Sequence, residues 1–271
     1  MNKRLSQKGF ALIEALIIVI IIVAIGGVGF FVLGKDKAAP DSSSKETPAT
    51  SSDAQEVAKK KEVKIKHLGV NLDYYDSATN KAGDFVFTKA KFTSGIQLLF
   101  TDYAYVISGA NTSTGKDKAN PQPTFILPLG SKVYSLIDGE VYDVPKLYSN
   151  DYSVMVQGEG SELIFETEHV INVKVKKGDK VKAGDVIAEV SDYSAHGYAG
   201  MGLVEIGVLK GGNPPYHLCP FDYLDDSIKT ETINKINALK KSWEQYRGDT
   251  SLYDESKEVT PGCLSKDPIE G

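Results

Sequence analysis

The stretch Val175-Lys-Lys-Gly-Asp-Lys-Val-Lys-Ala-Gly-Asp-Val-Ile187 contains the pattern Gly-Asp-x-Val-x-x-Gly-Asp. Glycine adopts the left-handed backbone conformations that tight turns require, and valine favours the half-buried surface of a pleated sheet. The stretch therefore predicts a hairpin that turns on its glycines and directs its valines into a core. This hairpin indicates a mainly β domain with an antiparallel sheet.

Short β-rich runs lie on both sides of this stretch. A second β set is expected between Phe125 and Val208, and residues 61–119 are expected to form a β-rich N-terminal part. In that part the turn residues of Asn80-Lys-Ala-Gly83 separate the first two runs, and Ala110–Gln122 is expected to be a polar loop. The predicted strands are Val63–Tyr75, Asp84–Phe92 and Ile96–Ile107.

The C-terminal part, residues 226–271, begins with a helical pattern. Between Ser227 and Tyr246 the apolar residues recur on one helical face, namely Ile233, Ile236, Leu239, Trp243 and Tyr246. Asp225, Asp226 or Ser227 is suited to cap the helix start, and Gly248 is suited to end it. This face is expected to pack against the β domain.

The N-terminal end has the pattern of a membrane anchor. Residues 1–9 carry three basic and no acidic side chains, which places this leader in the cytoplasm. Ala15–Leu33 contains 19 residues without a charge, about the length of one bilayer-spanning helix. We therefore expect a transmembrane helix over residues 10–34, with the rest of the chain extracellular or periplasmic. Glu14 is unusual there, because a carboxylate in a span costs about 2.5–3.5 kcal/mol on insertion scales.

Residues 35–60 are rich in Lys, Ala, Ser, Thr, Asp and Pro and predict a flexible linker. The formal charge of the whole chain is −5, and without the three basic leader residues it is −8, which argues against nucleic acid as a partner. The two cysteines, Cys219 and Cys263, fall in the part expected outside the membrane, where disulfides persist. We expect them to pair and to tie the C-terminal tail to the domain.

Two protein families use hairpins like the one at 175–187: biotinyl/lipoyl carriers, and lysostaphin/LytM-type zinc endopeptidases of peptidoglycan. Residues 120–225 resemble the second family, and the likeness extends to Cys219-Pro-Phe-Asp-Tyr-Leu224, which is similar to its closing Asp-Pro-x-x-Tyr-Leu. A carrier needs an exposed lysine with methionine flanks, and Lys146 in Val-Pro-Lys-Leu lacks them. The resemblance implies a LytM-like antiparallel sheet.

The resemblance also implies where zinc ligands would lie. The family binds zinc through a His-x-x-x-Asp pair and the second His of a later His-x-His. Counted from Pro128, the first pair falls on Asn120 and Thr124, and the His-x-His positions fall on Met201 and Leu203. Because these side chains do not replace imidazole and carboxylate ligands, we expect a pseudoenzyme without a metal or other cofactor.

One family position is retained. His169, nine residues before Gly178, matches the histidine that the resemblance associates with transition-state stabilisation. His169 and Met201 are therefore candidate groove residues, and the alternative for His169 is a residue on the surface or on an edge strand. A zinc site outside the family pattern would combine His169 with His196. Several tyrosines are expected near the groove-forming loops: Tyr142, Tyr148, Tyr152, Tyr193 and Tyr198.

The segment Lys-Gly-Phe-Ala-Leu-Ile-Glu at residues 8–14 resembles the class III signal of type IV pilins and pseudopilins. The resemblance implies cleavage by a prepilin peptidase between Gly9 and Phe10 and methylation of the new Phe10 amine. It also implies that Glu14 pairs with the amino terminus of a neighbouring pilin-like subunit. The linker departs from the usual pilin, in which the membrane helix continues into the head.

Three functions remain open from the sequence. The first is a membrane-anchored, pilin-like surface protein whose inactive peptidase-like domain binds cell-wall peptidoglycan or a protein during pilus assembly or adhesion. The second is an active peptidoglycan metalloendopeptidase with a rearranged zinc site. The third is a purely structural pilus-tip spacer or adhesin.

Overall fold

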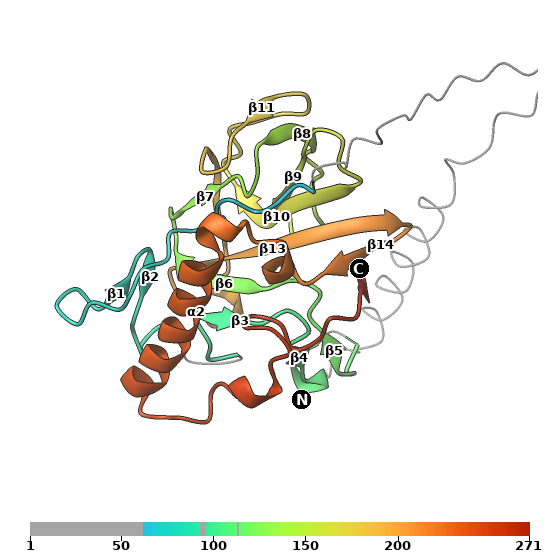
Figure 1. Cartoon of the computed structure of the whole chain (residues 1–271). Coiled ribbons are helices and arrows are strands. Elements are labelled where there is room, and N and C mark those ends of the chain that lie inside the picture. The colour runs from blue at the N-terminus through green and yellow to red at the C-terminus, as the bar shows by residue number, and fades with distance from the viewer. Residues whose placement is uncertain (1–61, 93–95, 113) are drawn as a thin grey trace, which may run out of the picture. The chain divides into compact units, whose positions relative to one another are not determined.

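The structure is a computed structural model that describes residues 62–92, 96–112 and 114–271 (Figure 1). The predicted leader, span and linker, and with them Gly9, Phe10 and Glu14, lie outside the described residues. Within the described ranges, no helix combines the length and the apolar character that crossing a membrane requires.

The described residues form a mainly β fold, as the sequence predicts. Its main element is an 11-stranded sheet in which all neighbouring strands are antiparallel. The strands of this sheet are β3 (Phe100–Thr101), β6 (Thr124–Pro128), β7 (Lys132–Tyr134), β8 (Gly139–Asp143), β9 (Tyr152–Gln157), β10 (Leu163–Ile171), β11 (Lys180–Val181), β12 (Val186–Asp192), β13 (Met201–Gly212), β14 (Pro215–Leu218) and β15 (Ile269–Glu270).

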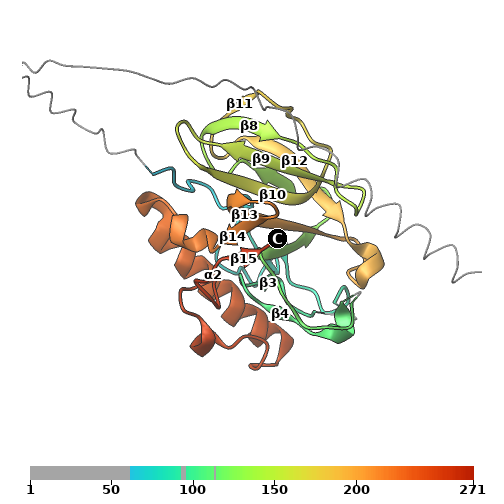
Figure 2. The same cartoon turned by 90° about the vertical axis from the view of Figure 1, so that its right-hand side faces the viewer.

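Strands β10 and β13 form the centre of the sheet. β13 is 12 residues long and pairs with β6, β10, β12 and β14, while β10 also pairs with β9. Figures 1 and 2 show these two strands crossing the middle of the molecule, with β8 and β11 at one end and β4 (Val106–Ile107) at the other. Residues paired in register share a face of the sheet, so side chains from the four neighbouring strands β6, β9, β12 and β14 meet around β10 and β13.

The glycine-rich stretch turns where predicted, but it does not form a hairpin. Gly178 and Gly184 have φ angles of 89° and 87°, and each lies in a turn closed by a backbone hydrogen bond. However, β11 pairs with β8, whereas β12 pairs with β7, β10 and β13. The prediction of a hairpin is therefore wrong: the second turn sends β12 to other partners, which a local pattern does not specify. The buried Val181 does face the core as expected.

The N-terminal part contains shorter strands than predicted. Its strands are β1 (Lys81–Ala82), β2 (Phe85–Val86), β3, β4 (Val106–Ile107) and β5 (Lys118–Ala119). The predicted strand over residues 63–75 makes only a bridge from Ile65 to Leu224, and the first hairpin turns at Gly83 and Asp84, not over residues 80–83. The apolar residues of this part enter the core without pairing in a ladder, among them Leu68, Val70, Phe87 and Phe92.

The C-terminal helix α2 spans Asp226–Arg247 and confirms the predicted helix. The Asp225 side chain accepts a hydrogen bond from the Ser227 amide at 3.0 Å, and Gly248 ends the helix in a left-handed conformation. Its apolar face is buried, as predicted, and the Trp243 ring packs edge-on against Phe87 at 5.4 Å between ring centroids. The short 3-10 helices are η1 (Gly109–Asn111), η2 (Ser194–His196), η3 (Pro220–Tyr223) and η4 (Glu255–Lys257).

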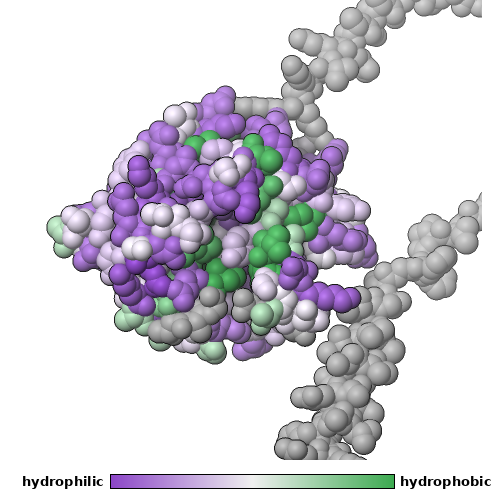
Figure 3. All heavy atoms as spheres, turned by 90° about the horizontal axis from the view of Figure 1, so that it is seen from below, coloured by the Kyte–Doolittle hydropathy of each residue, from purple (hydrophilic) through white to green (hydrophobic). Residues whose placement is uncertain are grey.

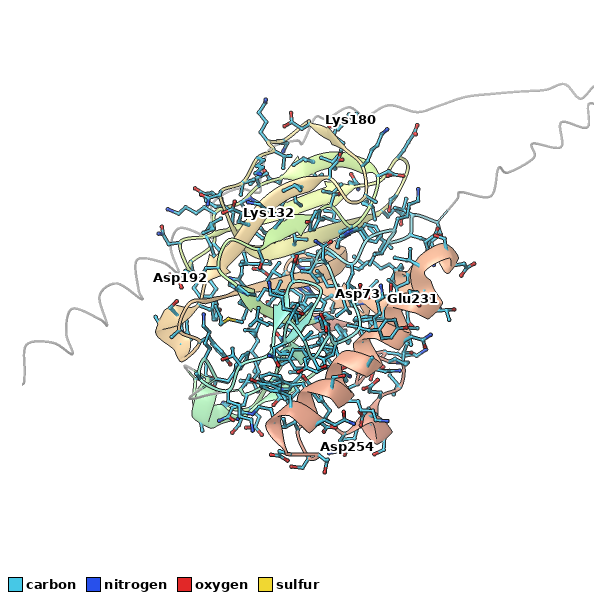
Figure 4. The ribbon with its side chains drawn as sticks, turned by 90° about the vertical axis from the view of Figure 1, so that its left-hand side faces the viewer. Asp73, Lys132, Lys180, Asp192, Glu231 and Asp254 are labelled. Carbon is cyan, nitrogen blue, oxygen red and sulfur yellow. A yellow bond between two sulfur atoms is a disulfide. The ribbon has the colours of Figure 1, made fainter. Side chains whose placement is uncertain are left out.

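Polar contacts also attach α2 to the rest of the fold. The fully buried Lys240 donates to Asp102 at 2.6 Å and also to Glu258. At the outer surface Lys235 lies 3.3 Å from Asp73 and 3.5 Å from Glu231, and Figure 4 shows those two acids side by side. Breaking the buried pairs of Lys240 would cost more stability than breaking the exposed pairs of Lys235, because an exposed ion pair contributes little to the free energy of unfolding.

Cys219 and Cys263 form the expected disulfide, with their Cα atoms 6.1 Å apart. The face seen in Figure 3 is mainly hydrophilic and carries a limited group of apolar residues. Among the large apolar or aromatic side chains of the described part, Tyr148 is the most exposed, at 95%.

Candidate functional site

The positions that correspond to zinc ligands in the LytM pattern lie together in the structure. The Asn120 amide donates to Thr124 Oγ1 at 2.8 Å, and the Thr124 hydroxyl donates to Glu205 Oε1, also at 2.8 Å. Leu203 lies one pleat along β13, opposite Ile126, and is buried. An amide, a hydroxyl and an alkyl group do not fit zinc, which binds imidazole, thiolate and carboxylate ligands.

His169 is placed by an irregularity in β10. The register between β9 and β10 shifts between Thr167 and Val170, so the chain gains one residue there. His169 adopts a φ angle of 59°, which is unfavourable for a non-glycine residue, and it is only 6% exposed. The alternative of a surface or edge-strand residue is therefore wrong, because β10 has paired neighbours on both sides and the bulge turns the ring inward.

The His169 ring is oriented by Asp151. Its Nδ1 atom lies 2.9 Å from Asp151 Oδ2, and the Ser149 hydroxyl approaches the same nitrogen at 3.4 Å. Burial opposes ionisation of Asp151, but hydrogen bonds from Ser149, Ser191 and His169 outweigh it and lower the pKa of Asp151. Ser149 and Asp151 lie at the same ring nitrogen, so the three do not form a nucleophilic triad, which needs the two partners at opposite nitrogens.

Four carboxylates gather on the same side of the central strands. We call Asp151, Glu166, Glu168 and Glu205 the acidic face. Glu168 and Glu205 are direct neighbours across β10 and β13, and Glu205 Oε2 lies 3.9 Å from His169 Nε2. Burial raises the pKa of Glu205, although the charge of His169 opposes this shift. Solvent reaches the acidic face at Glu168 and Glu205, which are half-buried.

Glu166 is the most deeply buried member of the acidic face. It accepts hydrogen bonds from Gln122 Nε2 at 2.8 Å and from Ser153 Oγ at 3.0 Å. A side chain at Gly207 would come within 2.8 Å of its Oε1 atom, so glycine leaves the space that this carboxyl group occupies. Burial, reinforced by the charge of Glu168, raises the pKa of Glu166 to about 8.

His217 approaches Glu166 from β14. Its Nδ1 atom is buried, has no hydrogen-bond partner among the described residues and lies 3.9 Å from Glu166 Oε1. Burial lowers the pKa of His217 to about 4, with a further contribution from the charge of Lys118. The neutral imidazole therefore faces a carboxyl group whose own neutral form is favoured.

The predicted groove residues divide into two groups. Tyr148 lies within the electrostatic reach of Glu168, Glu205 and Asp151, and the Tyr193 ring is 5.7 Å from that of His169. Met201 is fully buried in the hydrophobic core, so its prediction as a groove residue is wrong.

The remaining tyrosines are elsewhere. Tyr198 is buried and donates to the Ile96 carbonyl at 2.5 Å, Tyr152 is half-buried in β9, and the exposed Tyr142 ring lies beneath Lys177. His196 is exposed and packs on Tyr193. Within the described ranges, no group of three or more His, Cys, Asp or Glu side chains has an arrangement suited to a metal.

Two open pockets lie away from the acidic face. One is lined by residues of β8, β11 and the 157–160 turn, and the other lies between residues 66–72 and the first turns of α2. Neither contains His169 or Glu205. The candidate site around His169 is therefore defined by the contacts of its side chains and not by either pocket.

The sequence reasoning found His169, Asn120, Thr124 and Leu203 but missed the acids around them. Asp151 reaches His169 only because β9 pairs with β10, and Glu205 reaches it only because β10 pairs with β13. One signal was available: Glu166 and Glu168 alternate within the stretch Leu-Ile-Phe-Glu-Thr-Glu-His-Val-Ile of β10, which begins and ends with apolar residues. Two acids at a spacing of two in a buried strand point to one polar face.

The model of Peptidase family M23 matches residues 123–210 of the 271. This match covers β6 through most of β13, which is the region of the retained His169 and of Leu203. Residues 123–210 are therefore similar to an M23 peptidase domain, in agreement with the LytM-like pattern. No curated protein matches the chain.

Several solved structures are similar to this chain. The catalytic domain of the prophage-encoded M23 protein EnpA from Enterococcus faecalis is 23% identical, covering 38% of this chain and 77% of that one, with a TM-score of 0.32. The catalytic domain of lysostaphin from Staphylococcus simulans is 16% identical, covering 46% and 86%, with a TM-score of 0.34. A chain of the SpoIIQ–SpoIIIAH pore forming complex is 17% identical, and the match covers 64% of this chain and 98% of that one, with a TM-score of 0.37. The match to the solution structure of lysostaphin covers 40% of the lysostaphin chain.

Proposed function

We propose that this protein is a membrane-anchored surface protein whose M23-type domain binds a cell-wall or protein ligand without cleaving it. One observation carries the proposal: at the three zinc-ligand positions, Asn120 and Thr124 are hydrogen-bonded in a chain that ends at Glu205, and the third position is the buried Leu203. Zinc in the peptidases of this type activates water, and Asn120, Thr124 and Leu203 do not supply its ligands. His169 and Asp151 keep an oriented imidazole at the same place.

The zinc content of the full-length chain tests the loss of the metal site. The chain, purified in a mild detergent, is dialysed against trace zinc, and its metal content is measured by mass spectrometry. We expect far less than one equivalent. A stoichiometric zinc ion together with chelator-sensitive cleavage of peptidoglycan would overturn the proposal and favour a peptidase with a rearranged site.

A restored variant serves as the matched control. The triple substitution Asn120→His, Thr124→Asp and Leu203→His places the family ligands back at positions that already adjoin one another. We expect this variant to take up close to one equivalent of zinc. Failure of the restored variant to bind zinc, while it remains folded, would show that these positions do not correspond to the metal site.

Ligand binding is tested by sedimentation with purified peptidoglycan. We expect the full-length chain to co-sediment with the walls and to release no soluble fragments from them. Absence from the pellet would remove peptidoglycan as the ligand and favour a protein partner or a structural spacer.

We infer from the Gly9–Phe10 junction and Glu14 that the protein is delivered by the type IV pilin pathway. A prepilin peptidase and other pilin-like subunits are then its partners, and the ectodomain is displayed in a pilus or at the membrane. The test is a Glu14→Ala variant in the native host, with piliation and processing followed by microscopy and N-terminal mass spectrometry. Normal piliation with an uncleaved leader would contradict this part of the proposal.

A further inference from the structure

The acidic face has more negative charge than its surroundings neutralise. Among the described residues, Glu168 has no hydrogen bond or ion pair from its carboxylate, and Glu205 has only the hydroxyl of Thr124 and the distant His169 ring. The nearest lysine whose charge acts on Glu205 is the exposed Lys118, which makes no ion pair in the described part of the chain. Buried or half-buried carboxylates normally have a cationic partner.

The His169 ring presents an acceptor to this face. Asp151, whose pKa is lowered, can only accept at Nδ1 when it is ionised, so Nδ1 carries a proton, and in the neutral form of the ring Nε2 has a lone pair. Nε2 makes no hydrogen bond within the described residues, although the side chain is only 7% exposed, and it faces Glu205 Oε2 at 3.9 Å. Two acceptors at this distance do not bond to each other, but one donor atom bonds to both at about 2.8 Å each.

A second buried imidazole faces a carboxyl group along the acidic face. His217, only 6% exposed, directs its unpartnered Nδ1 toward Glu166 Oε1 at 3.9 Å. The neutral form of Glu166 can itself donate a hydrogen bond, so only the contact of His169 with Glu205 presents two facing acceptors. A donor-only group with several N–H bonds satisfies these two acceptors better than a neutral ligand.

Aromatic rings border the same place. The Tyr193 ring lies 5.7 Å from the His169 ring, and Tyr148 stands 95% exposed within the electrostatic reach of three of the four acids. An exposed aromatic ring beside carboxylates attracts an organic cation through its π face. A metal ion fits less well, because the described residues contain no group of three suitable ligands.

We propose that His169, Glu205, Glu168, Tyr148 and Tyr193 form a site for a primary ammonium group carried by a peptide ligand. Such a group offers three N–H donors and one positive charge, which match the facing acceptors and the unbalanced carboxylates. This inference rests on the proposed function, since it names the chemistry of the ligand that the M23-type domain binds. The ammonium group comes either from a lysine-type side chain or from a free peptide amino terminus.

The test is a titration of the full-length chain in detergent with three tripeptide amides, followed by ligand-observed NMR. One is acetyl-Ala-Lys-Ala-amide, one is the same peptide with an Nε-acetyl group, and one is Ala-Ala-Ala-amide with a free amino terminus. We expect the lysine peptide, the free-amine peptide or both to bind at least ten-fold more tightly than the neutral peptide. Equal binding of all three peptides overturns the inference.

Variants locate the site. Glu205→Gln keeps the oxygen that accepts from Thr124, and Glu168→Gln is on the half-buried rim, so both are expected to fold and to bind the preferred peptide at least ten-fold more weakly. Glu159→Gln removes an equal charge from an exposed position and is expected to bind as the parent does. Unchanged peptide affinity in both Glu205→Gln and Glu168→Gln overturns the assignment. So does a parent chain that binds no peptide but takes up zinc, if Glu205→Gln abolishes that uptake.

Walls with acetylated amines separate this inference from the proposed function. If native and acetylated walls sediment the chain equally, wall binding stands and the ammonium site is wrong. If no walls sediment the chain, the wall ligand is wrong, and the peptide titration still decides the ammonium site.

Discussion

Replacing Glu166 with glutamine is expected to remove a loss of stability at alkaline pH. The carboxyl group has a pKa of about 8 in the folded protein, because it is buried, against 4.5 ordinarily. Between these values the folded state holds a proton that the unfolded state has released. The contribution of this group to the free energy of unfolding is therefore fully present below pH 4.5. It is lost as the pH rises toward 8, by about 1.4 kcal/mol per pH unit.

His217 acts in the opposite direction over a different window. Its pKa is lowered by burial from 6.5 to about 4, so the unfolded state binds the proton first as the pH falls. Its contribution is complete above pH 6.5 and is lost between pH 6.5 and 4. The two effects largely cancel between pH 4.5 and 6.5. Above pH 6.5 the contribution of His217 is complete, and the contribution of Glu166 should lower the free energy of unfolding by about 2 kcal/mol by pH 8.

The assay is urea unfolding of a fragment of residues 58–271, which contains the whole hydrophobic core, followed by the fluorescence of the single, fully buried Trp243. Glu166→Gln keeps an acceptor for Gln122 and should hold its stability constant from pH 6.5 to 8, while the parent loses about 2 kcal/mol. Glu159→Gln, on the surface, should follow the parent. Parallel curves for the parent and Glu166→Gln over this range would refute the reasoning.

Three further predictions follow from the packing. Cys219→Ser opens a disulfide with a sequence separation of 44 residues and should lower the unfolding free energy by up to about 4 kcal/mol in urea, with no effect of reductant on the variant. Lys240→Met leaves two buried carboxylates without their cation, and a loss of about 3–5 kcal/mol in the same assay is expected, larger at pH 7 than at pH 4. Gly207→Ala puts a methyl group 2.8 Å from Glu166 Oε1, so calorimetry should show a lower melting temperature than for Gly130→Ala, where a methyl group meets nothing within 4 Å and only the left-handed φ is unfavourable.

The sequence predicted features that depend on local signals. Helix α2 is defined by its apolar period, by Asp225 at its start and by Gly248 at its end, and all three signals act within a few residues. The glycine turns at Gly178 and Gly184 were also local and correct. What failed was the pairing of the strands on either side of these turns, because antiparallel partners are chosen by contacts distant in sequence.

In the candidate site, too, the features that depend on local signals were predicted and those that depend on distant contacts were not. The LytM pattern places Asn120, Thr124, Leu203 and His169 by counting, and the structure brings them to one side of the sheet. The partners of His169 could not be counted, because Asp151 arrives through β9 and a one-residue bulge decides where the ring points. Alternation in a strand predicts a face, but it does not predict a bulge that shifts it.

Under the proposed membrane anchoring at the N-terminal end, the backbone at Ile65 has a mechanical consequence. Its amide donates to the Tyr223 carbonyl and its carbonyl accepts from the Asp225 amide, both at 2.8 Å, in a parallel bridge next to the start of α2. A pull transmitted from the preceding chain would load these two bonds first, together with the fully buried Ile65 side chain. Traction would thus reach the helix start and the disulfide-bonded η3 region before it reached β10, leaving the His169 region shielded from the load.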